Sequence, residues 1–214
     1  ASWPAHGDTP ELLLTHVEAA LHSAKSRQAG VVVYDAALDA NSDSSLSLLT
    51  EFRAALEHGH LELHLQPKVS LATGRVEGAE ALVRWRHPAR GLIPPIQFVP
   101  FLEQTGQIRL LTHWVLARSA ATWCELAAQG RKLQIAVNLS ARDLMDQDFP
   151  AKLRKLLAGH RLDAGALSLE ITESAMMDDP QRAMQTLASL HDMGIALSID
   201  DFGTGYSSLA YLKR

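Results

Sequence analysis

The chain has 214 residues, of which 47% are hydrophobic, and its formal net charge is −4 with acidic and basic residues well mixed. This length permits one large domain or one and a half small ones, and a chain without a basic excess is not expected to bind a nucleic-acid polymer. Cys124 is the single cysteine, which excludes an intrachain disulfide and favours a reducing cytoplasm.

The sequence also contains no apolar run near the roughly 20 residues that cross a bilayer, and it lacks a basic-then-apolar signal pattern. We therefore expect no direct membrane contact in this segment. A membrane or sensory domain upstream in a longer parent protein stays open.

The first 38 residues predict one helix and one short strand. Leu12, Leu13, Val17 and Leu21 recur at helical spacing after a Thr-Pro entry. Residues 31–34 form an apolar run that predicts a short buried strand. Because one helix and one strand cannot form a core alone, this segment is predicted to be the end of another domain.

A polar, serine-rich stretch at residues 39–45 predicts a boundary whose last residues cap a helix. The spacing of Leu46, Leu49 and Phe52 predicts an amphipathic helix, which Gly59 would end. We interpret residues 39–60 as a linker helix between two domains.

From Leu61 onward, predicted strands alternate with predicted helices. Residues 61–65 and 76–85 flank a Thr-Gly turn and predict an antiparallel hairpin. Further strands are predicted at residues 132–138, 167–172 and 195–200, and helices at 98–104, 108–129, 148–158 and 180–193. This alternation predicts an α/β fold with a mostly parallel sheet or barrel.

Oxygen-bearing side chains lie near the carboxyl ends of these strands. Glu80 and Asn138 precede Glu170 by 90 and 32 residues, and Asp200 follows it by 30, about one βαβ step. Such ligands, with no cysteine among them, suit a hard cation such as Mg²⁺ or Mn²⁺. Two cations bridged by Asp200 would suit phosphoester hydrolysis, because they activate water and neutralise charge on the phosphate.

Simpler interpretations of the same residues stay open at this point. Asp200 and Asp201 precede glycines and can belong to an ordinary turn after a strand, and the strand carboxylates can bond loop amides only. His58, His60 and His64 have irregular spacing, so we expect surface or packing roles for them.

Several strings resemble those of the EAL domain family, the phosphodiesterases that hydrolyse cyclic di-GMP to linear pGpG. The family's signature is similar to EALVRW at residues 80–85. The resemblance continues through QPK (66–68), WRHP (85–88), GLIPP (91–95), EQTG (103–106), VNLS (137–140), EITES (170–174) and IDDFGTGYSS (199–208). The implied fold is a TIM-like (β/α)₈ barrel whose first strand runs antiparallel, beginning near residue 61.

The resemblance implies a two-metal centre with Mg²⁺ or Mn²⁺. Glu80, Asn138, Glu170 and Asp200 would bind the first ion, and Asp200 with Asp201 would hold the second.

It also implies residues that bind substrate or support the site. Gln66 would contact the nucleotide, Leu82 would lie along it, and Arg84 would contact a phosphate. Glu173 would brace the loop at residues 202–208, and the family habit implies a homodimer through the EAL domain. The implied catalytic set is Glu80, Asp200, Asp201 and Glu173.

Residues 1–38 resemble the C-terminal end of a GGDEF (diguanylate cyclase) domain, without the signature loop of that domain. Residues 61–214 supply only about five of the eight strands, for which a barrel typically needs ~250 residues. We therefore expect a C-terminally incomplete barrel from a longer tandem GGDEF–EAL protein, and no turnover by this segment alone.

The sequence thus predicts metal-dependent hydrolysis of cyclic di-GMP to pGpG in bacterial second-messenger signalling. The alternative, from a different class, is a receptor or signalling module that binds cyclic di-GMP without cleaving it. An unrelated metal phosphohydrolase would explain the carboxylates but not the matching strings.

Overall fold

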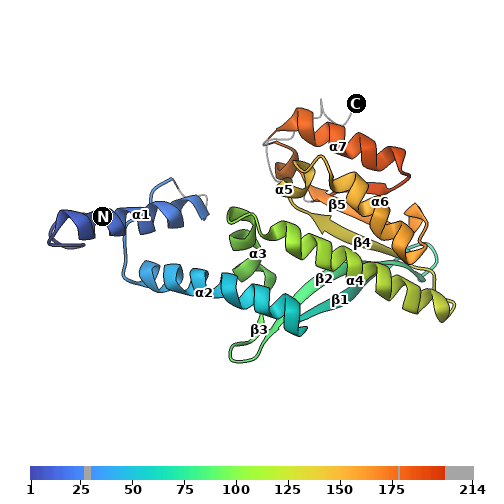
Figure 1. Cartoon of the computed structure of the whole chain (residues 1–214), viewed down its shortest axis with the longest axis horizontal. Coiled ribbons are helices and arrows are strands. Elements are labelled where there is room, and N and C mark those ends of the chain that lie inside the picture. The colour runs from blue at the N-terminus through green and yellow to red at the C-terminus, as the bar shows by residue number, and fades with distance from the viewer. Residues whose placement is uncertain (27–29, 178, 201–214) are drawn as a thin grey trace.

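The structure is a computed structural model that describes residues 1–26, 30–177 and 179–200 (Figure 1). Within these residues a mixed sheet has the strand order β1-β2-β4-β5-β6, and β3 pairs with β2 beside this path. The strands are β1 (Leu61–Val69), β2 (Val76–His87), β3 (Gly91–Ile93), β4 (Gln134–Leu139), β5 (Leu167–Thr172) and β6 (Ala196–Asp200).

The helices follow the strands in the alternation that the sequence predicts. They are α1 (Pro10–Ser26), α2 (Ala37–His58), α3 (Pro95–Gln104), α4 (Ile108–Ala128), α5 (Ala141–Leu144), α6 (Phe149–His160) and α7 (Pro180–Asp192). Short 3₁₀ turns, η1 (Ala164–Ala166) and η2 (Ser174–Met176), flank β5. In the described part of the chain, no helix has the length and apolar character needed to span a membrane.

The direction of the strands agrees with the predicted topology. β1 and β2 form the predicted antiparallel hairpin, in which Gln66 lies opposite Glu80. β2, β4, β5 and β6 pair in parallel, because each crossover between them carries helices. An antiparallel first strand followed by parallel strands is the order that the resemblance implied.

Alternate residues of the strands face opposite sides of the sheet. The register keeps odd-numbered residues on one side, since Leu61 pairs with Trp85 and Ile135 pairs with Leu167. We call this side the apolar face. It consists mainly of Leu61, Leu63, Leu65, Ala79, Ala81, Val83, Trp85, Ile135, Val137, Leu139, Leu167, Leu169, Ile171, Leu197 and Ile199.

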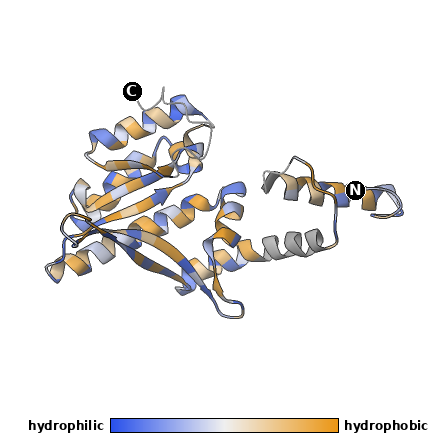
Figure 2. Ribbon diagram, turned by 180° about the vertical axis from the view of Figure 1, so that it is seen from behind, coloured by the Kyte–Doolittle hydropathy of each residue, from blue (hydrophilic) through white to orange (hydrophobic). Residues whose placement is uncertain are grey.

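Helices α3, α4, α6 and α7 pack their own apolar residues on that face, among them Leu111 and Leu153. Figure 2 shows the resulting pattern, in which hydrophobic and hydrophilic residues alternate in short bands along helices and strands. Val137, Leu167 and Leu169 are completely buried, so this face forms the core of the domain.

The last turns of α2 belong to the same core. Phe52 is completely buried and packs edge-on against Trp85 of β2, with ring centroids 6.0 Å apart. Phe98 of α3 also packs edge-on against Trp85, with ring centroids 5.4 Å apart. His87 follows on β2, where its Nε2 lies 3.2 Å from Glu51 of α2. The helix is therefore fixed to the strand that carries the family signature.

Two local expectations are wrong. Residues 31–34 form no strand in the described part of the chain, and Val31 and Val33 are 84% and 66% exposed. A strand needs a neighbour for its backbone hydrogen bonds, and none of the described strands pairs with this run.

The second wrong expectation is that residues 39–45 precede the linker helix and cap it. This stretch lies inside α2, which begins at Ala37. The stretch contains neither glycine nor proline, so its polar residues do not prevent helix formation.

Candidate functional site

Seven of the predicted site residues share the side of the sheet opposite the core. Glu80 pairs with Ala136 of β4, two residues before Asn138 on the same side of that strand. Asn138 pairs in turn with Glu170 of β5. We call this side the polar face. Its predicted site residues are Gln66, Glu80, Leu82, Arg84, Asn138, Glu170 and Asp200.

Direct contacts connect neighbouring members of this set. The Asn138 side-chain amide donates a hydrogen bond of 2.8 Å to Glu80 Oε1. Glu170, which is 9% exposed, accepts from the Lys68 ammonium in an ion pair. Lys68 was not among the predicted site residues. Its position two residues after Gln66, on the same side of β1, is the signal that could have identified it.

The donor atoms on the polar face fit a hard divalent cation. They are carboxylate and amide oxygens, which Mg²⁺ and Mn²⁺ prefer, and Glu170 already attracts the cationic end of Lys68. Within the described residues, no three His, Cys, Asp or Glu side chains converge as a metal site. Three strand spacings separate β2 from β6, about 14 Å along the sheet, so convergence depends on how strongly the sheet curves.

Glu173 and Asp201 complete the predicted catalytic set. Glu173 follows β5 directly and is 6% exposed. Asp201 and the loop at residues 202–208, which Glu173 was predicted to brace, lie outside the described residues.

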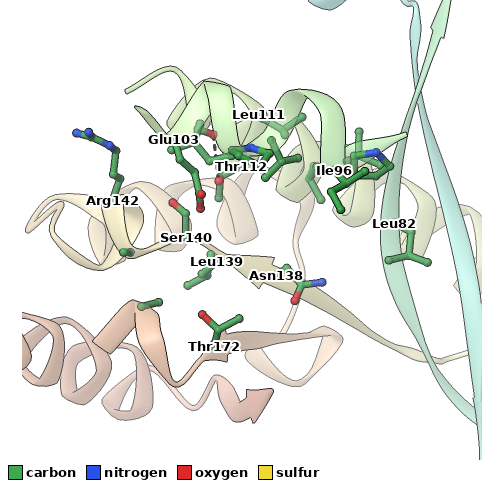
Figure 3. A pocket seen from close by; sticks show the side chains of 18 of the residues that line it. Leu82, Ile96, Glu103, Leu111, Thr112, Asn138, Leu139, Ser140, Arg142 and Thr172 are labelled. Atoms are coloured by element: carbon green, nitrogen blue, oxygen red, sulfur yellow. Dashed lines mark hydrogen bonds between the residues drawn. The ribbon is translucent and has the colours of Figure 1, made fainter. Parts of the chain in front are cut away.

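A pocket of about 720 Å³ opens at the carboxyl ends of β2, β4 and β5, where these ends meet α3 and α4 (Figure 3). Leu82, Arg84 and Asn138 line it, so the pocket reaches the polar face. Arg84 donates to the Val83 carbonyl oxygen at 2.8 Å. Ligands of α/β folds collect at this end of the strands, which makes the pocket the candidate substrate site.

A turn with several internal hydrogen bonds follows β4 and begins α5 beside the pocket. Ser140 caps α5, and Asp143 accepts hydrogen bonds from the Ser140 backbone and hydroxyl at 3.0 and 2.6 Å. Thr112 of α4 donates to the same oxygen of Asp143 at 2.8 Å. Burial raises the pKa of the Asp143 carboxyl although these hydrogen bonds oppose the shift. The turn therefore holds β4, α4 and α5 together beside the pocket.

Comparison with known proteins places this geometry in a family. The sequence profile of the EAL domain matches residues 49–214. Among curated relatives, "Bifunctional diguanylate cyclase/cyclic di-GMP phosphodiesterase MucR" of Pseudomonas aeruginosa is 42% identical over all of this chain and 32% of its own length. "Cyclic di-GMP phosphodiesterase PdeR" of Escherichia coli is 36% identical over 99% of this chain and 32% of its own length.

Solved structures give the same result. "PaMucR Phosphodiesterase, c-di-GMP complex" is 45% identical with a TM-score of 0.72, over 78% of this chain and 68% of that one. "Structure of EAL Enzyme Bd1971 - cAMP and cyclic-di-GMP bound form" is 29% identical with a TM-score of 0.73, over 98% and 55%. This chain spans about a third of the length of the curated relatives MucR and PdeR described above.

Proposed function

Because this chain belongs to the EAL domain family, we propose that its parent protein hydrolyses cyclic di-GMP to linear pGpG with the help of divalent metal ions. The observation that carries the proposal is the row of oxygen ligands on the polar face, which continues into a pocket at the carboxyl ends of the strands. The relatives named above as cyclic di-GMP phosphodiesterases support the choice of substrate.

In this proposal, Glu80, Asn138, Glu170 and Asp200 hold the first Mg²⁺ or Mn²⁺, and Asp200 and Asp201 hold the second. Bound metal ions would activate water and neutralise charge on the phosphate. The Asn138 amide keeps the Glu80 carboxylate in place through the 2.8 Å hydrogen bond.

Substrate would lie in the pocket, with its phosphate toward the metal ligands. Arg84 would contact that phosphate and Leu82 would lie along the nucleotide, since both line the pocket. Gln66, opposite Glu80 on β1, would contact the nucleotide from the neighbouring strand. Glu173, next to the end of β5, would support the loop that follows Asp201.

The ion pair between Lys68 and Glu170 favours a second candidate, a receptor that binds cyclic di-GMP without cleavage. An ammonium group already neutralises one carboxylate of the set, so a ligand could bind here without a full complement of metal ions.

A turnover assay of the full-length parent protein decides between the two. With Mg²⁺ we expect conversion of cyclic di-GMP to pGpG, and with Ca²⁺ binding without conversion. Asp200→Ala should lower kcat/KM by roughly a thousandfold, because metal stabilisation of the transition state is worth several kcal/mol. Asp192→Ala, on the exposed end of α7, is the matched control and should keep full activity. Binding without turnover in Mg²⁺ by the wild type would establish the receptor instead.

We also propose that residues 1–38 are the end of a GGDEF domain. The MucR relative, which is named as a bifunctional diguanylate cyclase and phosphodiesterase, aligns with all of this chain. The exposed apolar side chains of Val31 and Val33 are consistent with contacts to preceding residues of such a domain.

A further inference from the structure

The ion pair between Lys68 and Glu170 crosses the sheet. Lys68 lies on β1 and Glu170 on β5, with β2 and β4 between them, and on a flat sheet these three strand spacings would amount to roughly 14 Å. Strand side chains stand roughly perpendicular to their sheet, so two of them meet over this separation only where the sheet curves toward them. The Lys68 ammonium nevertheless donates to Glu170 Oε1. The polar face is therefore concave, and the ion pair lies inside the concavity.

The register shows from which end of the strands Lys68 reaches its partner. Lys68 pairs with Gly78, and Gly78 pairs with Gln134 of β4. Gln134 precedes Asn138 by four residues, and Asn138 is the residue that pairs with Glu170. Lys68 thus starts nearer the amino ends of the parallel strands than the proposed ligands do. Its ammonium approaches Glu170 from the end opposite the pocket.

Small residues on the polar face leave room for the lysine chain on this path. Gly78 has no side chain, and a Cβ atom there would lie 3.0 Å from the Gln134 carbonyl oxygen. Ala136 and Ser168 pair with each other on the next two strands. The Lys68 side chain is 47% exposed and that of Glu170 is 11% exposed. A nearly buried carboxylate therefore has a cationic partner whose long, flexible stem still reaches solvent.

Glu170 can serve two cations that exclude each other. A carboxylate with so little exposure is costly to leave without a counter-ion, and the Lys68 ammonium supplies one. A metal ion bound to the same carboxylate would supply another, but two cations at one carboxylate repel each other. Lys68 and a divalent ion therefore compete for Glu170.

We propose that Lys68 is the resident counter-ion of Glu170 and sets the metal affinity of the site, because Glu170 gives up the ammonium when it becomes a metal ligand. The inference rests on the proposed function, in which Glu170 helps to bind the first Mg²⁺ or Mn²⁺. Lys68 stabilises the metal-free protein and raises the metal concentration at which the site fills. Removal of its charge therefore has opposite effects on these two properties.

The first test measures Mn²⁺ binding to the full-length protein without nucleotide, by electron paramagnetic resonance of the free ion. Lys68→Met removes the charge at nearly constant size, so the Mn²⁺ dissociation constant should fall roughly tenfold, as expected when a charged hydrogen bond no longer competes. Lys68→Arg keeps the charge and should bind Mn²⁺ like the wild type. Lys152→Met is the matched control, because Lys152 pairs with Asp146 of α6's preceding loop at similar side-chain exposures of 57% and 12%. It should leave the constant unchanged.

Melting temperatures give a second readout that a purely structural role would not produce. In EDTA, Lys68→Met should melt below the wild type, because the Glu170 carboxylate has lost the ammonium. Saturating Mn²⁺ should remove this difference.

The inference is overturned if Lys68→Met leaves the Mn²⁺ constant unchanged or raises it, or if its melting temperature falls equally with and without Mn²⁺. A wild type that binds no Mn²⁺ overturns both the inference and the proposed metal site. If Mn²⁺ binding responds to Lys68→Met as expected but the wild type hydrolyses no cyclic di-GMP, the proposed function alone fails. The two failures are therefore distinguishable.

Discussion

The two faces of the sheet differ sharply although alternate residues of the same strands form them. On β5, Leu169 is completely buried under helices, and the next residue, Glu170, forms an ion pair with Lys68 on the polar face. The apolar face holds the helices to the strands, and the polar face carries the proposed ligands. Since a strand alternates its side chains with a period of two, one short sequence determines both stability and chemistry, and each can be altered separately.

The largest effect is expected on the apolar face. Leu169→Ala should lower the free energy of unfolding of this domain by about 2–5 kcal/mol, because it removes buried methyl groups and leaves a cavity. Chemical denaturation of the full-length protein measures the loss. Ser168→Ala, the neighbouring position on the polar face, should cost far less. Equal losses for the two variants would contradict the division of the sheet into two faces.

The corresponding change on the polar face should affect activity instead. Glu170→Gln keeps the size of the side chain but removes its charge, so we expect kcat/KM for cyclic di-GMP to fall roughly a hundredfold or more. The melting temperature should fall less than in Leu169→Ala. Glu77→Gln, an exposed residue at the start of β2, is the matched control. Full activity of Glu170→Gln would exclude Glu170 as a metal ligand.

The smallest effect is expected at an exposed ion pair on the β1–β2 hairpin. Arg86 donates to Glu62 at 2.6 and 3.1 Å, and this hydrogen bond, with help from His64, lowers the pKa of Glu62 to about 2 from 4.5. A depressed carboxyl pKa stabilises the folded state above pH 4.5, and this contribution is lost as the pH falls toward 2.

Glu62→Gln should therefore reduce stability slightly at neutral pH, and the difference from the wild type should vanish between pH 4.5 and 2. Denaturation at several pH values measures it. The effect is small because both partners are exposed to solvent. A difference that is constant across this pH range would show that the charge of Glu62 has no part in it.

The sequence predicted the sheet because its strands depend on local patterns. The alternation at residues 61–65 and the continuous apolar runs around Val137 and Leu169 are sufficient to locate strands, and the helix at Ile108 was predicted at its first residue. The short β3 was missed, because three residues contain too little periodicity to identify a strand. The run at residues 31–34 has a strand-like composition, but its state depends on a pairing partner that composition does not reveal.

The candidate site was predictable only where it follows from strand register. Asn138, Glu170 and Asp200 recur at about the repeat of the fold, so their place on successive strand ends follows from the sequence alone. The contact of Lys68 with Glu170 joins residues 102 positions apart, and no local pattern indicates it.

The attachment of α2 has a mechanical consequence. A helix of 22 residues is a stiff rod about 33 Å long, and its last turns are fixed in the core by Phe52 and by the contact of Glu51 with His87. Its first turns extend away from the sheet (Figure 1). A force applied to these first turns is transmitted along the helix to its contact with Trp85. Trp85 lies five residues from Glu80 on β2. Torque on the helix is thus delivered to the strand that carries the first proposed metal ligand.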